Sequence, residues 1–583
     1  MVGVNATVSQ ATRAAPMTDL AGRAADAAPP FWHRPGVWVA VLVLYGACLY
    51  LPWLGAWPLA SHEALAAERA REMTTIGGWV IPHLRGEPDI RKPPLPFWIS
   101  GALAAAAGGM TEWTARLPSV AASLGTMLLL VGWMRRVAGW RTAIITGVTY
   151  LTGSMVVLLS RRAEVDMQLC FWTTAAVVGY WFGIHALSRR LQVAWMAAVW
   201  LSLALGVLTK GPLPLAILGI VAAAVAVVSR DGRRIGRMLP VAGPLIFLGV
   251  LVPWGVWVET HLPGAFSRWY AESLGRFAGE MGHEKPAAFY LTHAPLLVLP
   301  WILPAGVGMV LALRRRGVSR TVAVYLLAWA VGGLVFLTLG IGKRIHYALC
   351  TVPPLMAFAG LGMDYLLSLP RPLPRAWRWV LGSHVVLVPA ALAAGMVTSV
   401  WFPDFRWPLR ALGIAAAAGL TAAFVWYARG RRLAALGALA ATVLVTFTAA
   451  NGLIITPLLR SSVTEARIGR FVRDEAGGPQ AVAFYRQVDP QILFYAGHGG
   501  VLLESKDDVA AWLAAHPGGY LIVRNDADRD EITPLGPWQE VLLGLAARPL
   551  ASRDFVLLKS MDAPDGKMER LPAQANGKGD RHE

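Results

Sequence analysis

Apolar stretches long enough to cross a membrane recur along most of this chain, and short polar loops separate them. A helix needs about 20 mostly apolar residues to cross the roughly 30 Å of hydrocarbon in a bilayer. Windows of this kind predict about thirteen transmembrane helices. They cover residues 37–57, 117–134, 142–159, 169–187, 194–208, 212–228, 240–257, 293–313, 321–341, 346–367, 378–400, 410–428 and 433–458.

The composition supports lipid as the main solvent of this chain. Hydrophobic residues make up 56% of it and charged residues only 15%, whereas soluble domains are roughly a quarter charged. The net charge of +18 would otherwise suggest a nucleic-acid partner. The positive charges lie in short loops between apolar stretches, however, so they indicate topology and acidic lipid headgroups, and we expect no nucleic-acid partner.

Arginine-rich loops alternate along the chain and predict its orientation. Cytoplasmic loops carry an excess of Lys and Arg, and every arginine-rich loop falls on one side if the N-terminus is cytoplasmic. These loops contain Arg135, Arg136 and Arg141; Arg189 and Arg190; Arg230 to Arg237; Arg314 to Arg320; Arg371 to Arg378; and Arg429 to Arg432. The long loops 58–116 and 258–292 then lie on the outer side, in a bacterial inner membrane.

The two ends of the chain differ from its apolar middle. Residues 1–35 are polar and alanine-rich, and we interpret them as a disordered cytoplasmic tail. Residues 461–562 have the composition of a soluble domain, which we expect to be a small periplasmic α/β domain. Its β-like runs are AVAFY at 481–485, ILFYA at 492–496, YLIVR at 520–524 and FVLLK at 555–559. Residues 563–583 are predicted to be a disordered tail.

The first outer loop has an unusual density of ionisable residues, in the run SHEALAAERAREMTTIGGWVIPHLRGEPDIRKPPLPFWISG. Its first part, from Glu63 to Met73, has a helical pattern. A second helix is expected to start at RKPPLPFW, because Pro93 and Pro94 suit the first turn of a helix. The sequence therefore predicts two helices on the outer membrane surface, with charged residues between them.

This loop resembles the first periplasmic loop of the protein-mannosyltransferase-like (family 39) GT-C glycosyltransferases, which include the lipid A aminoarabinose transferases. The similarity runs from Glu63 through AREM, GGWVIPHLRGEP and KPPLPFW to TARLPS at 114–119. Further similar motifs are RRAEVDMQL at 161–169, LTKGPL at 208–213, SLGRFAGEMGHEKPAAFYL at 273–291 and KRIHYALCTVPPLMAFAG at 343–360. The resemblance implies an α-helical integral membrane protein with a GT-C transmembrane catalytic domain over residues 36–460.

The resemblance also implies a reaction: inverting transfer of a hexosyl or pentosyl group from a polyprenyl-phosphate donor to a lipid A or glycolipid acceptor. A carboxylate would activate or orient the acceptor, and fixed positive charge would stabilise the leaving phosphate. The family pattern makes Glu63 the candidate base and Asp166 the second catalytic acid. The candidate ligands of the donor phosphate are Lys92, Lys210, Lys343 and Arg344.

A second set of residues in the same motifs is implied to bind substrate: Arg116, Arg161, Arg162, Arg276, His283, His346 and Tyr347. Structural roles compete with these functions. Glu63 suits the N-terminus of a helix, where an exposed acid is stabilised by the helix dipole. Asp166 could pair with Arg161 or Arg162, and lysines at helix ends can extend to the membrane surface.

Two positions depart from the pattern of the aminoarabinose transferases. His62 and Arg91 stand where many members carry an acid. These differences leave the sugar, the acceptor and the presence of a divalent metal ion open. Three other classes also stay open: an enzyme similar to O-antigen ligases or polymerases, a lipid or solute transporter, and a binding protein without catalysis. A transporter would be expected to carry ionisable residues near the bilayer midplane, and the predicted spans have almost none.

Overall fold

The computed structural model describes residues 35–232, 237–239, 241–275, 284–314, 316–369, 387–476, 478–524, 526–541 and 555–561. Both predicted disordered tails fall outside these ranges, apart from Pro35. Most of the described chain is helical, as expected where lipid cannot satisfy backbone N–H and C=O groups. Within the described residues, seven helices are long and apolar enough to cross a membrane, or nine if each of two bent pairs forms one span. The protein is therefore a multi-span membrane protein.

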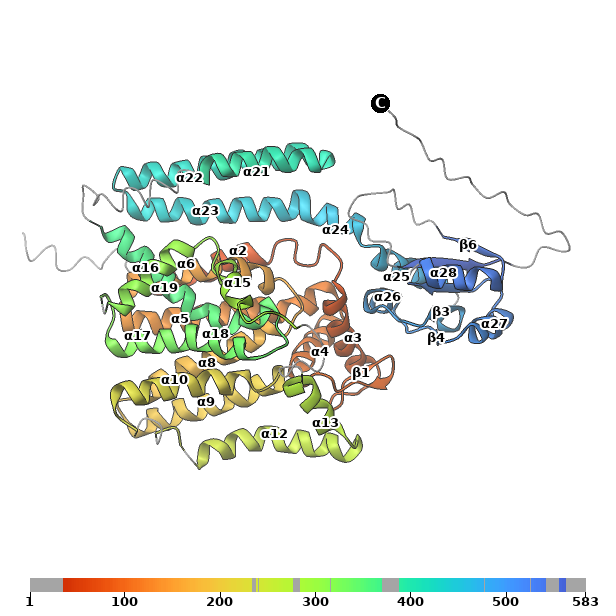
Figure 1. The fold of residues 1–583 in the computed structure, drawn as a ribbon, viewed down its shortest axis with the longest axis horizontal. Helices are drawn as coiled ribbons and strands as arrows, with labels where there is room; N and C mark the ends of the chain where they lie inside the picture. Colours follow the sequence, from red (N-terminus) through yellow and green to blue (C-terminus); the bar gives the residue numbers. More distant parts are fainter. Residues whose placement is uncertain are drawn as a thin grey trace, which may run out of the picture.

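The bundle is built from long helices and broken helices (Figure 1). Its first part contains α2 (Pro35–Tyr50), α5 (Glu112–Ala138), α6 (Trp140–Leu151), α7 (Ser154–Ser160), α8 (Asp166–Ile184), α9 (Arg189–Thr209), α10 (Leu213–Ser229) and α12 (Ala242–His261). The next part contains α15 (Phe289–Leu297), α16 (Ile302–Leu313), α17 (Arg320–Leu327), η3 (Ala328–Gly332), α18 (Gly333–Leu339), η4 (Ile345–Thr351) and α19 (Val352–Ser368). The last part contains α21 (Leu387–Trp401), η6 (Pro403–Phe405), α22 (Arg406–Ala428), α23 (Arg432–Ala450), η7 (Asn451–Ile455) and α24 (Thr456–Ser462). A described helix overlaps each of the thirteen predicted windows, although the start of window 378–400 lies outside the described residues.

Small residues let some of these helices pack closely. A Cβ atom added to Gly362 of α19 would lie 1.9 Å from the carbonyl oxygen of Pro304 in α16, and one added to Gly308 would lie 1.9 Å from that of Phe358. Membrane helices commonly use small residues at such contacts, because apolar side chains gain little by leaving lipid. The α16–α19 contact is thus fixed by the two glycines.

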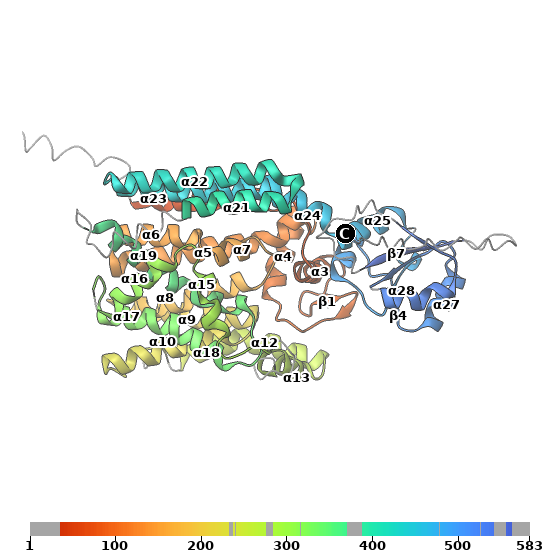
Figure 2. The same cartoon turned by 45° about the horizontal axis from the view of Figure 1, so that its top comes forward.

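The elements of the two outer loops gather at one end of the bundle (Figures 1 and 2). They are α3 (Ser61–Thr75), β1 (His83–Leu84), β2 (Glu87–Pro88), α4 (Leu95–Ala107), α13 (Ala265–Tyr270) and η2 (Ala271–Gly275). The helices predicted for the first outer loop are confirmed, and α4 begins directly after Pro94. At the other end of the bundle, Arg141 forms an ion pair with Asp364 of α19 at 2.9 Å. The arginine-rich loop between α5 and α6 therefore lies at the end opposite to these elements (Figure 1).

Residues after α24 form a mixed sheet flanked by helices, drawn in blue in Figure 1. Strand order is β4-β3-β5-β7-β6, where β3 is parallel to β4 and β5, and β7 is antiparallel to β5 and β6. The strands are β3 (Val482–Tyr485), β4 (Val501–Leu503), β5 (Tyr520–Val523), β6 (Trp538–Glu540) and β7 (Val556–Ser560). The helices are α25 (Thr464–Glu475), η8 (Pro479–Ala481), α26 (Pro490–Ala496), α27 (Lys506–Ala515), α28 (Asp526–Ile532) and η9 (Thr533–Leu535).

One predicted strand is wrong: ILFYA at 492–496 belongs to helix α26. The Asp489 side chain accepts hydrogen bonds from the N–H groups of Gln491 and Ile492 at 2.8 and 3.1 Å, and Pro490 occupies the first turn. Gly497 ends the helix in the left-handed conformation, with φ 83°. These capping residues stabilise a short helix, and they outweigh the strand preference of the residues between them.

Candidate functional site

The start of helix α3 places Glu63 in the third position of the helix. There its Oε2 accepts a hydrogen bond from the N–H of Ala60, the residue just before the helix, at 2.9 Å. A Glu at this position commonly bonds back to the residue before the helix, because the first N–H groups of a helix have no partner within it. The local sequence thus explains where α3 starts and why an acid is found there.

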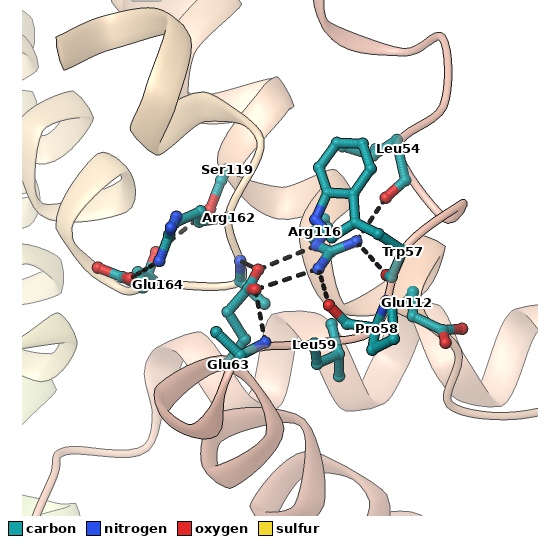
Figure 3. A network of polar contacts seen from close by, with 12 residues as sticks. Leu54, Trp57, Pro58, Leu59, Glu63, Glu112, Arg116, Ser119, Arg162 and Glu164 are labelled. Carbon is teal, nitrogen blue, oxygen red and sulfur yellow. Dashed lines mark hydrogen bonds and ion pairs between the residues drawn. The ribbon is translucent and has the colours of Figure 1, made fainter. Parts of the chain in front are cut away.

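Glu63 is buried against Arg116 of α5 (Figure 3). The guanidinium donates Nε to Oε1 at 2.9 Å and Nη2 to Oε2 at 3.1 Å. The N–H of Ala163 also donates to Oε1, at 2.7 Å. Each carboxylate oxygen therefore accepts two hydrogen bonds. Burial alone would raise the pKa of Glu63, but the charge of Arg116 and these hydrogen bonds outweigh it and lower the pKa.

The guanidinium of Arg116 also has a partner for each of its N–H groups. Its remaining N–H groups donate to the carbonyl oxygens of Leu54, Trp57 and Pro58 at 2.7, 3.0 and 3.1 Å, so all five guanidinium donors have partners. The side chain is 0% exposed. Arg116 and Glu63 together tie the segment before α3 to α5 and to the loop after α7. The expectation of an exposed acid at the start of α3 is wrong, because Glu63 is only 2% exposed.

Asp166 lies in a different setting, at the first residue of α8. Its Oδ1 accepts a hydrogen bond from the Nζ of Lys210, which directly follows α9, at 2.6 Å. The same ammonium group lies 4.8 Å from the ring centre of Tyr347. Lys92 and His346 are close enough to Asp166 to interact with it electrostatically. The structure therefore brings together five of the predicted site residues, from four separate motifs.

The alternative in which Asp166 pairs with Arg161 or Arg162 is wrong. Arg162 instead contacts Glu164 at 3.5 Å. Arg161 donates Nη1 to the carbonyl oxygens of Leu49 and Tyr50 at 3.2 and 2.7 Å. Both arginines have other partners, and the ion pair of Asp166 among the described residues is with Lys210.

Lys92 and its neighbours form an extended charged group. Lys92 lies 3.5 Å from the carboxylate of Glu272 in η2. Arg91 bonds to Asp89 at 2.6 Å, and Asp89 also bonds to the buried Arg69 at 2.7 Å. The two arginines hold the pKa of Asp89 well below its usual value, despite its burial. Asp89 and Glu272 are not among the predicted site residues, although the acid of the EPDIRK run was a usable signal.

The residues of the KRIHY motif at 343–347 make contacts in two different places. The Nζ of Lys343 donates to the carbonyl oxygen of Lys285 at 3.1 Å, and its side chain is 4% exposed. The carbonyl oxygen of Arg344 accepts a hydrogen bond from Tyr290 at 3.1 Å. His346 and Tyr347 lie near the Asp166–Lys210 pair. Lys343 instead bonds to the backbone of the loop predicted over residues 258–292. Arg276 and His283 lie outside the described residues.

A cavity of about 1050 Å³ opens beside Glu63, between α7, the α23–η7 helix and the C-terminal domain. Its lining includes the apolar residues Val157 and Phe447 and the polar residues Arg161, Gln487 and Arg524. Arg161 is 4% exposed, and its Nη2 contacts no acceptor among the described residues. Across the described chain, no three His, Cys, Asp or Glu side chains are grouped as metal ligands.

Sequence and fold comparisons relate this chain to known glycosyltransferases. Residues 91–257, which contain Lys92, Arg116, Asp166 and Lys210, match the family model described as dolichyl-phosphate-mannose-protein mannosyltransferase. An undecaprenyl phosphate-alpha-4-amino-4-deoxy-L-arabinose arabinosyl transferase from Pectobacterium atrosepticum is 30% identical over 392 residues, which cover 64% of this chain and 67% of that relative. The chain belongs to the protein-mannosyltransferase-like GT-C glycosyltransferases.

Other members of this GT-C family extend the similarity. A transferase of the same description from Serratia proteamaculans is 28% identical over 398 residues, covering 66% of this chain and 70% of the relative. The crystal structure of ArnT from Cupriavidus metallidurans bound to undecaprenyl phosphate has a TM-score of 0.74 at 20% identity. It covers 91% of this chain and 98% of the other, so the two folds are alike over most of their length. The aminoarabinose transferases are therefore relatives of this protein.

Proposed function

We propose that this GT-C glycosyltransferase transfers a sugar, with inversion, from a polyprenyl-phosphate donor to a lipid acceptor such as lipid A or another glycolipid. The family of the chain and the names of its relatives support the reaction class. The undecaprenyl phosphate bound to the structure of similar fold supports the type of donor.

The observation that carries this proposal is the Asp166–Lys210 pair, with Lys92 and His346 within electrostatic reach. Departure of a polyprenyl phosphate develops negative charge at its oxygen atoms, and fixed cations stabilise that charge. Lys210 bonds to Asp166, and Lys92, from a separate loop, is within electrostatic reach of the same carboxylate, so the two lysines can hold a phosphate together. Asp166 is the carboxylate bonded to Lys210, and it can orient or deprotonate the acceptor.

Glu63 takes a positioning role in this mechanism. All of its acceptor sites are occupied, and Arg116 stabilises its ionised form. A general base needs a lone pair within reach of the acceptor proton, and Glu63 would first have to break a hydrogen bond to Arg116 or the backbone. We therefore assign acceptor activation to Asp166 and assign to Glu63 the geometry of the loops around it.

The cavity beside Glu63 suits a lipid acceptor. Its lining combines apolar side chains with the buried guanidinium of Arg161, which lies 4.9 and 5.5 Å from the rings of Trp57 and Phe447. A buried cation without a carboxylate partner is costly, and a phosphate or carboxylate on the acceptor headgroup would compensate it. The acceptor chains would then lie along α7 and α23.

We further propose thirteen transmembrane spans within residues 36–460, with the outer loops 58–116 and 258–292 and the C-terminal α/β domain 461–562 in the periplasm. The position of the arginine-rich loop between α5 and α6, at the end of the bundle opposite to α3 and α4, supports this orientation. The N-terminus is cytoplasmic in this arrangement. Lipids of the bacterial inner membrane surround the helices.

The decisive experiment supplies the purified protein with undecaprenyl phosphate linked to single sugars, and with lipid A or another glycolipid as acceptor. Mass spectrometry of the product should show a mass increase of one sugar residue and free undecaprenyl phosphate. A product extended by a preassembled polymer would instead favour an enzyme similar to O-antigen ligases. Sugar-lipid movement across proteoliposomes without any transfer would favour a transporter. Comparison of lipid A from wild-type and deletion strains identifies the natural acceptor.

A further inference from the structure

The C-terminal domain holds the segment that leads into α3. The amide of Gln491 in α26 donates Nε2 to the carbonyl oxygen of Leu59 at 2.6 Å, and its Oε1 accepts from the hydroxyl of Ser61 at 3.1 Å. The Tyr495 hydroxyl accepts from the N–H of Leu59 at 2.8 Å. Both polar backbone groups of Leu59 thus bond to one short helix more than 430 residues away along the chain.

This contact is buried and polar. Gln491, Tyr495 and Leu59 are 7%, 6% and 0% exposed. The Tyr495 hydroxyl also donates to the carboxylate of Glu112, at the start of α5, at 2.9 Å. Buried hydrogen bonds of this kind fix direction and distance, whereas an apolar contact of equal area would tolerate sliding. The contact therefore sets the register of α3 against α26.

A short chain of bonds links this contact to the charged site. Leu59 precedes Ala60, whose N–H donates to Glu63. The other oxygen of Glu63 accepts from the N–H of Ala163 in the loop that leads to Asp166. A shift of Leu59 would thus move the first turn of α3, the Glu63 carboxylate and the loop that carries Asp166.

We propose that Gln491 and Tyr495 are positioning residues through which the C-terminal domain sets the geometry of the Asp166 site. The proposal rests on the function proposed above. It gives the C-terminal domain a part in the transfer step itself, since misplacement of about 1 Å at a reacting centre can cost on the order of 100-fold in rate. Donor binding depends on Lys92 and Lys210, which Gln491 does not contact.

The test compares the full-length variants Gln491→Met and Tyr495→Phe with the wild-type protein. Gln491→Met keeps the side-chain length and removes both hydrogen bonds, and Tyr495→Phe removes one hydroxyl group. Gln539→Met, on an exposed position of strand β6 in the same domain, is the matched control. The assay measures kcat, the donor KM and the melting temperature of each variant with an undecaprenyl-phosphate sugar.

We expect roughly a 10- to 100-fold lower kcat in Gln491→Met, a smaller loss in Tyr495→Phe, and a donor KM within about twofold of wild type in both. The control should match wild type. Lower melting temperatures with unchanged kcat at a permissive temperature would overturn the proposal, because they would show that the contact only stabilises the fold. If Gln491→Met does not fold, Tyr495→Phe decides by the same criterion. Absence of transfer by the wild-type protein would instead contradict the proposed function.

Discussion

Glu63 of α3 and Arg116 of α5, 53 residues apart in the chain, form a buried ion pair that joins the two helices. The pair has two N–H···O bonds of 2.9 and 3.1 Å, and neither side chain is more than 2% exposed. Around this pair, backbone groups of residues 54–60 and 163 supply the remaining hydrogen bonds. The acid of the first loop motif therefore holds the segment before α3, helix α5 and the loop after α7 together.

Replacement of Glu63 by Gln should destabilise the folded protein. Removing one partner of a buried ion pair typically costs about 3–5 kcal/mol, because the other charge stays buried and unpaired. The melting temperature of detergent-purified Glu63→Gln should fall clearly below that of wild type. The double variant Glu63→Gln with Arg116→Met should recover part of the loss. The control Glu531→Gln breaks an exposed pair with Arg486 and should melt like wild type. A wild-type melting temperature for Glu63→Gln would contradict this account.

Asp166→Asn should abolish most of the transfer activity. Removal of a general base typically lowers the rate by about 10²- to 10⁴-fold, and Asn cannot take a proton from the acceptor. The measurement is kcat with saturating donor, alongside the melting temperature. Glu164→Gln changes a neighbouring carboxylate of the same loop that contacts Arg162 instead of a lysine, and it should retain activity. Equal activity in Asp166→Asn and wild type would rule out Asp166 as the base.

Lys92→Ala and Lys210→Ala should weaken use of the donor. A hydrogen bond to a charged group contributes about 1.5–3 kcal/mol, so kcat/KM for the donor should fall by roughly 10- to 150-fold. The control is Lys506→Ala, which removes an exposed lysine paired with Glu531 in the C-terminal domain. Titration with undecaprenyl phosphate alone should show the same weakening. Unchanged donor affinity in both variants would show that these lysines do not hold the phosphate.

Stability should decrease as the pH rises through the range from about 4.5 to about 7, in part because of Glu68. Burial raises the pKa of Glu68 to about 7, against the opposing charge of Arg71. Since the folded-state pKa lies above the unfolded value, the folded protein binds the extra proton in this interval and loses stability when it is removed. Glu68→Gln should flatten the dependence of melting temperature on pH between pH 5 and 8. An unaltered slope would show that Glu68 does not titrate there.

The proposed orientation predicts that the C-terminal domain is reachable from outside the inner membrane. A cysteine at Lys506, which is exposed, should react with a membrane-impermeant maleimide in intact spheroplasts. A cysteine at Arg189, exposed at the start of α9, should react only after the membrane is permeabilised. The reverse pattern would mean that the topology is inverted.

The sequence by itself determined the helical, membrane-spanning class of this protein. It also divided the loops into an arginine-rich set and a set that carries the motifs. Apolar windows near 20 residues predict helices because lipid leaves the backbone no other partner. The same local signals predicted α3, α4 and most strands of the C-terminal domain. Only the strand predicted at 492–496 failed, where capping by Asp489 and Gly497 favoured a helix.

The tertiary structure alone decided which groups these polar and charged side chains contact. Lys210 lies 44 residues from Asp166, Arg116 lies 53 from Glu63, and Gln491 lies 432 from Leu59. No local pattern in the sequence encodes such pairings, because they depend on how helices distant in the chain pack against each other. Burial is equally non-local: Glu63 and Asp166 have similar positions at helix starts, and yet the neighbours supplied by packing make one a structural centre and the other the acid of a cationic site.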